Sequence, residues 1–229
     1  ARTMGIPAIV RLGDVFTAAM NGKRAAVDGS AGTLWIDPTD AIYEIVRAKS
    51  SDLDARRQQL QQYKGLPSVT KDGVSVRLMA NVGSVEDCEA AMENDAEGVG
   101  LFRTEFQYLG ASAYPGEEEL FRCYRAAVET MKGRPVTFRT LDIGADKQAP
   151  YLALPEEANP AMGIRAVRLY LARRDLMRTQ LRALYRASVY GQMVIMIPMI
   201  DSVWELQEVR VAARLACREL GAEGIPFNP

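Results

Sequence analysis

The chain contains no histidine among its 229 residues. Catalytic triads of the Ser-His-Asp type, Cys-His nucleophiles and His-ligated zinc all need an imidazole, so this sequence excludes each of these chemistries. For the same reason, no residue of this sequence can become a phosphohistidine. Any reaction in which the chain takes part must use other side chains.

Cysteine is scarce, and long apolar runs are missing. The three cysteines are odd in number and form no Cys-x-x-Cys motif, being Cys88, Cys123 and Cys217. This pattern is typical of small, reduced thiols in a cytosolic protein. The densest apolar run, residues 193–200, is far shorter than the ~20 residues of a membrane-spanning helix. We therefore expect a cytoplasmic protein without a membrane segment, and we interpret the run as a buried strand.

The charge is nearly balanced, with 28 Lys plus Arg against 29 Asp plus Glu. One local exception is a series of arginines spaced by four residues on one face of a predicted helix: Arg174, Arg178, Arg182 and Arg186. A basic face can dock phosphate backbones, but the apolar residues between these arginines are typical of an amphipathic helix with a solvated polar side. We expect no nucleic-acid partner.

Residues 1–38 predict a small β-rich unit. Two short stretches, Ala25–Asp28 and Thr33–Ile36, are separated by four residues that begin and end with glycine, which predicts a β-hairpin. Residues 7–10 predict a further short extended segment. We interpret this unit as the remnant of a larger domain.

A long helix is predicted within a linker of residues 39–72. Asp37 followed by Pro38 is typical of a helix start, because proline fits the first helical position. A heptad-like seam then runs through Ile42, Val46, Lys49, Leu53, Arg56, Leu60 and Tyr63. Since two members of the seam are charged, we expect a long, partly exposed helix or helix pair that links two domains rather than a strong coiled coil.

Residues 73–229 alternate short apolar strands with helical stretches. Strands are predicted at 74–80, 98–102, 136–141 and 194–199, and helices at 85–95, 117–132, 159–188 and 202–220. Such α/β alternation is typical of a parallel sheet covered by helices, with strands buried on both faces. Four βα units are the first half of a TIM-type (β/α)8 barrel, which is our first interpretation. An open doubly wound sheet is the alternative.

The ends of the sequence predict a fragment. The chain starts at Ala1 without an initiator methionine and stops at Pro229, where a new element would begin. Half a barrel would also leave two sheet edges unpaired, which is a liability for a soluble protein. We expect the native protein to continue on both sides.

Functional groups of a βα barrel lie at the C-terminal ends of its strands, and there this sequence places arginines. Arg103 follows an apolar strand, Arg139 lies near the end of the next, and Arg165 follows a segment that opens with Asn159 and Pro160. A partly buried guanidinium without a partner is costly, so each arginine needs a carboxylate or an anionic ligand.

Either kind of partner, a carboxylate of the chain or an anionic ligand, is possible for these arginines. Glu105, Asp142 and Asp146 are nearby candidates for structural ion pairs. Two carboxylates four residues apart in a turn are more often loop caps than metal ligands, so no metal site is predicted here. Three arginines converging on one rim indicate instead a small, multiply charged anion, because a guanidinium binds phosphate and carboxylate bidentately. Phosphoryl transfer needs mainly such positioning and charge neutralisation.

Three segments resemble consecutive motifs of the phosphoenolpyruvate-utilising enzymes, at residues 97–106, 139–147 and 159–168. The middle segment is most similar to Enzyme I of the bacterial phosphotransferase system, apart from Ala145 in place of the more usual glycine. Pyruvate phosphate dikinase and phosphoenolpyruvate synthase share the Gly-Leu-x-Arg-x-Glu theme but generally lack the Arg-Thr-Leu-Asp-Ile-Gly form. The resemblance extends over essentially the whole chain.

The resemblance implies a ligand for the arginines and a reaction for the full-length protein. By match to the family motifs, Arg103 and Arg139 bind phosphoenolpyruvate, and Arg165 matches a third position at the same mouth. The family passes the phosphoryl group, with Mg²⁺, to a histidine on a swivelling domain and then to the phosphocarrier protein HPr. That histidine lies shortly before the equivalent of Ala1, so residues 1–38 would be the end of the swivelling phosphohistidine domain.

The resemblance also implies what this chain lacks. The magnesium ligands and the proton-donating cysteine of the family lie beyond the equivalent of Pro229, so no cysteine here inherits a catalytic role. We expect weak anion binding without turnover, and a homodimer for the full-length protein. Two alternatives are kept: an enzyme similar to pyruvate phosphate dikinase or phosphoenolpyruvate synthase, and a non-catalytic regulatory or docking module that retains the scaffold.

Overall fold

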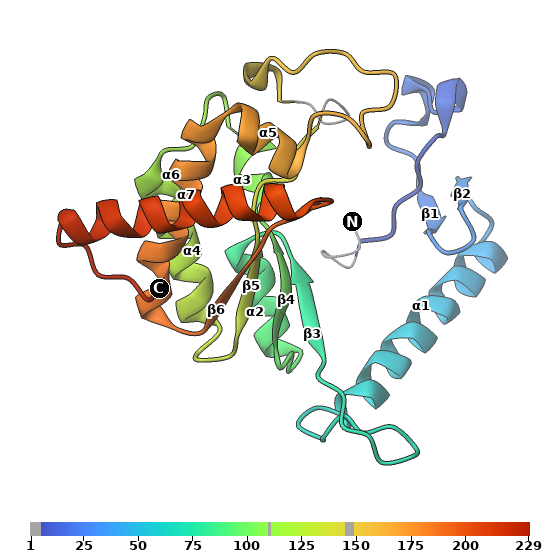
Figure 1. Cartoon of the computed structure of the whole chain (residues 1–229). Helices are drawn as coiled ribbons and strands as arrows, with labels where there is room; N and C mark the ends of the chain where they lie inside the picture. The colour runs from blue at the N-terminus through green and yellow to red at the C-terminus, as the bar shows by residue number, and fades with distance from the viewer. Residues whose placement is uncertain (1–5, 110, 145–148) are drawn as a thin grey trace. The chain divides into compact units, whose positions relative to one another are not determined.

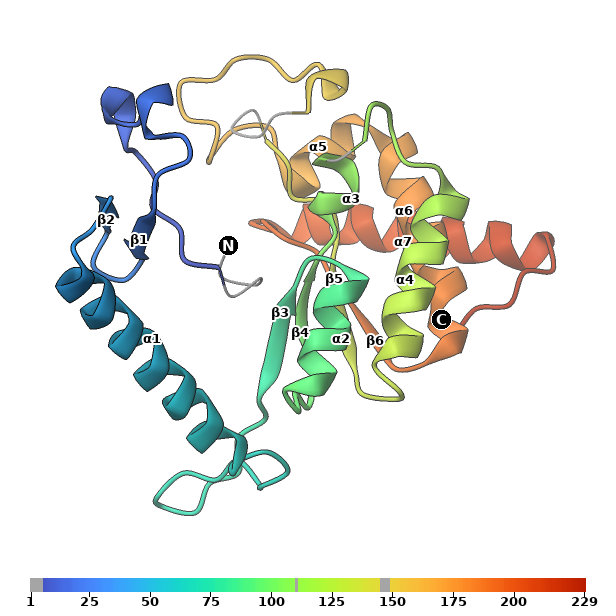
Figure 2. The ribbon, with the colours of Figure 1, turned by 180° about the vertical axis from the view of Figure 1, so that it is seen from behind.

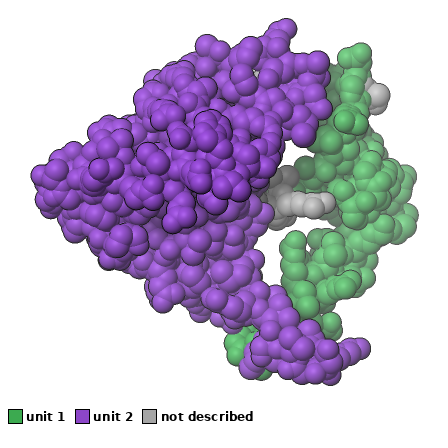
Figure 3. All heavy atoms as spheres, in the orientation of Figure 1, with its two compact units in different colours: residues 1–66 green, residues 67–229 purple. Residues whose placement is uncertain are grey.

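The computed structural model describes residues 6–109, 111–144 and 149–229. The chain divides into two compact units, residues 1–66 and residues 67–229, which Figure 3 shows in different colours. Each unit is described below by itself.

The first unit contains the predicted hairpin. Strands β1 (Ala25–Asp28) and β2 (Thr33–Ile36) pair antiparallel, with Ala25 opposite Ile36. The Asp28 carboxylate holds the connecting turn by accepting hydrogen bonds from the Ser30 hydroxyl at 2.6 Å and from the Ala31 N–H at 3.0 Å. These bonds, together with the ammonium group of Lys49, hold the pKa of Asp28 well below its usual range. The hairpin prediction is confirmed.

The segment before the hairpin, predicted as a short extended piece, belongs to neither of the described sheets. Residues 7–10 form no strand, and the chain continues instead into two 3₁₀ turns at Gly13–Val15 and Ala18–Met20. A short stretch without a pairing strand leaves its backbone groups to water, so an apolar sequence alone is not enough to make it a strand.

Helix α1 spans Asp40–Gln61 and confirms that a long, continuous helix is present in this region. It begins later than predicted, because Asp37 adopts a φ of 54°, which is incompatible with a helix, and Thr39 occupies the N-cap position. No residue of α1 is buried. The Lys49 ammonium lies 3.0 Å from the Asp28 carboxylate and joins α1 to β1.

The second unit is built on a four-stranded parallel sheet with the order β3-β4-β5-β6. The strands are β3 (Met79–Val82), β4 (Gly98–Arg103), β5 (Val136–Arg139) and β6 (Met193–Met196). All four predicted strands are present, so the α/β class is confirmed. The first starts five residues later than predicted, because residues 70–73 turn the chain back and allow Val69 to bridge Ser75.

Burial of the strands differs from the prediction at the sheet edges. The inner strands β4 and β5 hold the fully buried Phe102 and Phe138, whereas Val194 of β6 is 54% exposed. We expected the run 193–200 to be a buried strand, and this is wrong for the described structure. In a four-stranded sheet, the outer strands have one neighbour only and are therefore covered less well.

Six α-helices accompany the sheet in the described part of this unit. They are α2 (Val85–Glu93), α3 (Glu105–Leu109), α4 (Glu117–Thr130), α5 (Ala166–Ala172), α6 (Arg174–Ala187) and α7 (Val203–Ala222). Two 3₁₀ turns lie at Pro150–Leu152 and Ser188–Tyr190. Residues 159–165, predicted as helix, are not helical, because Ala166 has a φ of 50° and interrupts any helix from Pro160 into α5. None of the helices in the described ranges has the length and apolar content to cross a bilayer.

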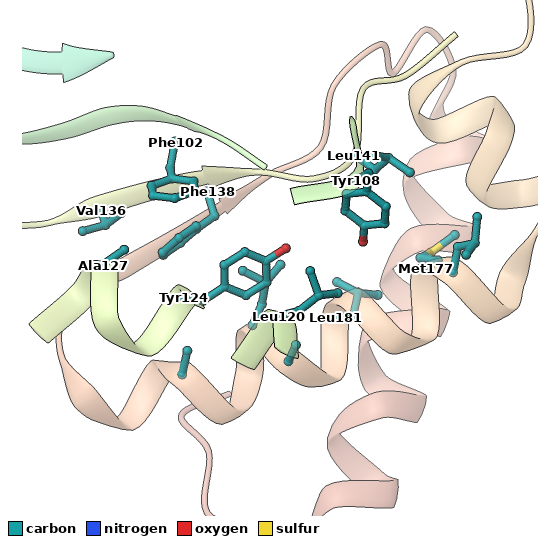
Figure 4. Packing of buried hydrophobic residues seen from close by; sticks show 14 of the residues in the cluster. Phe102, Tyr108, Leu120, Tyr124, Ala127, Val136, Phe138, Leu141, Met177 and Leu181 are labelled. Carbon is teal, nitrogen blue, oxygen red and sulfur yellow. The ribbon is translucent and has the colours of Figure 1, made fainter. Parts of the chain in front are cut away.

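The core lies between the sheet and its covering helices. Figures 1 and 2, taken from opposite sides, show α2 and α4 on one face of the sheet. Figure 4 shows Phe102 and Phe138 from the strands packing toward Tyr124 of α4, and the two phenylalanine rings lie 5.0 Å apart between centroids. Leu181 of α6 extends the same apolar cluster. This packing holds the ends of β4 and β5 in place.

All four arginines of the series on α6 are paired with acids, which corrects the prediction of a simply solvated side, although Arg174 and Arg178 remain well exposed. Arg182 is 4% exposed and lies among Glu117 of α4 and Glu219 and Glu223 of α7, at distances of 2.5 to 3.3 Å. The other three arginines pair with acids of the same two helices: Arg174 with Glu208, Arg178 with Glu219, and Arg186 with Glu117 and Glu118. The series is therefore an interhelical ion-pair network.

Helix α7 begins with a capping box. The Ser202 hydroxyl accepts a hydrogen bond from the Glu205 N–H at 3.2 Å, and the Glu205 carboxylate accepts one from the Ser202 N–H. Replacing Ser202 with alanine should lower the free energy of unfolding by about 1 kcal/mol, because a backbone N–H loses its partner. Urea denaturation followed by circular dichroism measures this loss. Ser202→Thr keeps the hydroxyl and should stay near the wild type, and an equal loss in both variants would contradict the capping role.

Candidate anion-binding site

The sheet register brings Arg103 and Arg139 together. Each is the last residue of its strand, β4 and β5, and the two are direct partners in the parallel ladder. Adjacent strands lie about 4.8 Å apart, and paired residues point to the same face of the sheet. Two guanidinium groups therefore start from neighbouring positions at the carboxyl edge, where βα folds hold their ligands.

Glycines allow strand β4 to approach its surroundings closely. A Cβ atom on Gly98 would lie 2.7 Å from the Pro135 carbonyl oxygen, and one on Gly100 would lie 2.9 Å from the Met79 side chain. Packing thus requires the two glycines of the Gly-Val-Gly part of the first motif. They allow the strand that ends in Arg103 to lie close to its neighbours.

Arg103 has a cationic side chain without an acidic partner. Among the residues that the structure describes, no carboxylate forms an ion pair with it, and its buried Nε–H donates no hydrogen bond. Its guanidinium carbon lies 4.9 Å from the centroid of the Phe106 ring. That ring lies directly against Gly83, where a Cβ atom would come within 2.5 Å of it. A cation–π contact compensates only part of the cost of removing an arginine from water, so this group is suited to an anion.

Arg139 is held by two carboxylates. It forms an ion pair with Glu105, which is 2% exposed, and its Nη1 lies 3.5 Å from Asp142. The Nε of Arg139 is nevertheless buried without a hydrogen-bond partner. The Thr140 hydroxyl, next in the chain, is likewise buried without one. Buried donors without partners are rare in folded proteins, and two of them on neighbouring residues indicate a place where a ligand binds.

Arg165 joins the same cluster from the loop that precedes α5. Its Nε donates a hydrogen bond of 2.9 Å to Asp142, the carboxylate that Arg139 also contacts. The loop is closed by Glu157, which accepts a hydrogen bond of 3.0 Å from the Ile164 N–H, and by Arg168, which donates one of 2.6 Å to the Met162 carbonyl. The shared acid places Arg165 beside Arg139.

Both interpretations of the arginines thus apply in part. Arg139 and Arg165 form the structural ion pairs expected with Glu105 and Asp142, whereas the charge of Arg103 has no acid within the described part of the cluster. The third candidate acid, Asp146, and the neighbouring Ala145 lie outside the described residues. Sequence reasoning missed the Phe106 ring, although its position three residues after Arg103 in the first motif was the available signal.

The residues of the cluster do not fit a magnesium site. Glu105 and Asp142 are already occupied by guanidinium groups, and the described residues contain no group of three acids, cysteines or histidines that could hold a metal ion. We therefore assign no step at this site to Mg²⁺.

The cysteines take no part in the cluster. All three are free thiols, as predicted. Burial raises the pKa of Cys88 to about 12 and that of Cys123 to about 11, so both remain protonated and unreactive at neutral pH.

The amino-acid sequence that contains these arginines is similar to a known protein family. Residues 57–229 match the family described as PEP-utilising enzyme, PEP-binding domain, where PEP stands for phosphoenolpyruvate. The chain belongs to the PEP-utilising enzymes. The resemblance noted in the three motifs is confirmed by this match.

Individual PEP-utilising enzymes resemble the chain along its whole length. It is 42% identical to the phosphoenolpyruvate-protein phosphotransferase of Staphylococcus carnosus over 98% of this chain and 39% of the relative. Identity to the proteins of the same name from Priestia megaterium and Haemophilus influenzae is 43% and 40%, over 100% of this chain and 40% of each relative. The chain thus spans about two fifths of the length of these relatives.

Proposed function

We propose that Arg103, Arg139 and Arg165 bind phosphoenolpyruvate at the carboxyl edge of the sheet. The observation that carries this proposal is the buried Nε of Arg103, which has no partner although Arg103 lies in register beside Arg139. A small anion inserted between the two strand ends would satisfy both Nε groups. Family membership supports phosphoenolpyruvate as that anion, since the matching family is named for binding it.

The three arginines have different roles in this proposal. Arg103 pairs with no acid among the described residues, so it can bind the incoming ligand without breaking an ion pair seen there. Arg139 and Arg165 must share their charge between Asp142 and the ligand. A guanidinium keeps its charge at any physiological pH and matches phosphate and carboxylate groups geometrically. The cluster would therefore bind and orient the anion and neutralise its charge.

We propose that the whole protein is an Enzyme I-type phosphotransferase. The relatives' name, phosphoenolpyruvate-protein phosphotransferase, supports phosphoenolpyruvate as the donor and a protein as the acceptor. In this proposal the phosphoryl group passes to a histidine outside this chain and then to an HPr-type carrier, in a cytoplasmic homodimer. The Mg²⁺ of the whole protein would be held by residues beyond the equivalent of Pro229.

The fold supports the corresponding domain assignment. We propose residues 1–38 as the end of the swivelling domain, 39–72 as the linker and 73–229 as the first half of a TIM-type barrel. The strand order β3-β4-β5-β6 follows the chain without reversal, as in a barrel, whereas a doubly wound sheet reverses its order at a switch point.

Titration calorimetry with phosphoenolpyruvate tests the binding proposal on this chain. We expect a dissociation constant of about 1 mM, equivalent to roughly −4 kcal/mol, because the site holds few contacts for the ligand. Pyruvate, which lacks the phosphate, and inorganic phosphate, which lacks the carboxylate, should each bind more weakly. Radiolabelled phosphoenolpyruvate should leave no stable phosphoenzyme, since the chain has no histidine. Equal affinity for all three ligands would refute a site selective for phosphoenolpyruvate.

A further inference from the structure

Gln180 is a fully buried polar residue close to the two strand ends. It lies on α6 with 0% of its surface exposed, and its side chain makes three hydrogen bonds. The amide oxygen accepts one from the Leu141 N–H at 3.0 Å. The amide nitrogen donates one to the Thr104 hydroxyl at 2.9 Å and one to the Tyr124 hydroxyl at 2.8 Å. Both amide hydrogens are therefore used.

The orientation of this amide is determined by its partners. A backbone N–H can only donate, so the atom of Gln180 that faces Leu141 must be the oxygen. The nitrogen then faces the two hydroxyl groups. Since the Thr104 hydroxyl accepts from Gln180, its own hydrogen is available for another acceptor.

That acceptor is the backbone of the neighbouring strand. The Thr104 hydroxyl donates a hydrogen bond of 2.7 Å to the Arg139 carbonyl oxygen. Gln180 therefore reaches β5 by two routes, directly at Leu141 and through Thr104 at Arg139. Thr104 is also the residue between Arg103 and Glu105, so the same hydroxyl anchors the end of β4.

We infer that Gln180 is a positioning residue for the anion site, which sets the end of β4 relative to the end of β5. The inference rests on the proposed function, in which Arg103 and Arg139 bind phosphoenolpyruvate together. Gln180 itself touches neither guanidinium group. It acts through Thr104 and through the backbone on either side of Thr140.

A partial substitute for Gln180 exists at one of its contacts. The Tyr170 hydroxyl lies 3.2 Å from the Leu141 N–H and accepts from the same donor. Loss of Gln180 would therefore leave Leu141 with a partner, while Thr104 would lose the amide that holds it. The expected result is a displaced strand end in a protein that still folds.

The Gln180→Met variant tests the inference, because methionine has a similar length and no hydrogen-bonding amide. We expect the dissociation constant for phosphoenolpyruvate to rise about tenfold, since displacements of an ångström or less at a binding group have effects of this order. Leu184→Ala is the control. Leu184 is fully buried on the same helix and has no polar contact, so its truncation lowers the melting temperature without disturbing the network. Its dissociation constant should remain that of the wild type.

Thr104→Val provides a second variant that decides the question even if Gln180→Met fails to fold. Valine keeps the shape of threonine and removes the hydroxyl, so this variant should also weaken binding about tenfold. Because both residues act through one chain of hydrogen bonds, the double variant should lose about tenfold rather than a hundredfold. Wild-type affinity in Thr104→Val, or an equal loss in Leu184→Ala, would overturn the inference.

Nuclear magnetic resonance separates this inference from the proposed function. In Gln180→Met without ligand, we expect the Arg139 Nε–Hε and Leu141 amide signals to shift, and Leu184→Ala to leave them in place. If the wild type binds no phosphoenolpyruvate, the proposed function fails, but the signals still show whether Gln180 positions the strand ends. Unshifted signals in Gln180→Met would overturn the positioning role, whatever the calorimetry shows.

Discussion

The Arg139→Met variant should lose measurable phosphoenolpyruvate binding and about 3 kcal/mol of unfolding free energy. The two losses have different causes. Binding falls because one of the two guanidinium groups at adjacent strand ends is removed. Stability falls because Glu105, which is almost fully buried, loses its guanidinium partner. Removing one member of a buried ion pair leaves the cost of burying the other charge less well compensated.

Arg103→Met is the matched variant for this prediction. It removes the same kind of side chain from the neighbouring ladder position, but from a residue that pairs with no acid in the described ranges. We expect it to lose affinity by about a hundredfold, as for a lost charge-assisted contact of roughly 3 kcal/mol. Its unfolding free energy should equal or exceed that of the wild type, because a partly buried cation that pairs with no described acid is removed.

Calorimetry and urea denaturation on the same preparations measure both quantities. The contrast between the variants is the decisive result, since each serves as the control of the other. If Arg103→Met were destabilised as strongly as Arg139→Met, the ion-pair assignment would be wrong. If either variant kept wild-type affinity, that arginine would not bind the anion.

Substituting Arg182 with methionine should destabilise the chain by about 3–5 kcal/mol without changing anion binding. Arg182 is 4% exposed and is the common partner of three carboxylates from two helices: Glu117, Glu219 and Glu223. Without it, these acids lie close together around an apolar side chain. Arg174→Met is the control, because Arg174 is largely exposed and its pair with Glu208 should be worth about 0–1 kcal/mol.

The pH dependence of stability provides a second measurement on Arg182→Met. Burial alone would raise the pKa of Glu117, but hydrogen bonds from Arg182 and Arg186 outweigh it and lower that pKa below its ordinary value of 4.5. Arg178 and then Arg182 lower the pKa of Glu219 in the same way. A carboxyl group whose pKa is lowered in the folded state stabilises the protein at pH values above its ordinary pKa. This stabilisation is lost as the pH falls through the folded-state pKa.

Wild-type stability should therefore decrease as the pH is lowered below about 4.5. In Arg182→Met the glutamate pKa values move back up, so this decrease should be shallower. Urea midpoints measured between neutral and acidic pH give the two slopes. Parallel slopes in the wild type and in Arg182→Met would contradict the role of Arg182 in these ion pairs.

The local sequence pattern predicted well which helices and strands are present in this fold. It predicted poorly the residues at which they begin and end. The hairpin at β1 and β2 follows from glycines around a four-residue turn, and the four parallel strands follow from short apolar runs between helical stretches. The late start of β3 and the non-helical residues 159–165 could not be predicted in this way. Both depend on single backbone angles and pairings, such as the positive φ of Ala166.

The candidate site shows the same division. The positions of Arg103 and Arg139 at strand ends were readable, because a strand ends where its apolar run ends. Which arginine would be paired could not be predicted, because Glu105 follows Arg103 by two residues in the sequence but pairs with Arg139, 34 residues away. The structure assigns both acids to Arg139, and Asp142 to Arg165 as well.

The amino-acid sequence by itself determined the α/β alternation, the arginines at the strand ends and the family motifs that contain them. Only the tertiary structure decided that Arg103 pairs with no described acid, that Arg182 is buried among glutamates, and that Gln180 forms a hydrogen bond with Thr104. The last two residues are 76 positions apart in the chain. Periodicity describes the neighbours of a residue along one element, whereas hydrogen bonds and ion pairs between elements depend on register and packing, which arise only when the whole sheet and its helices assemble.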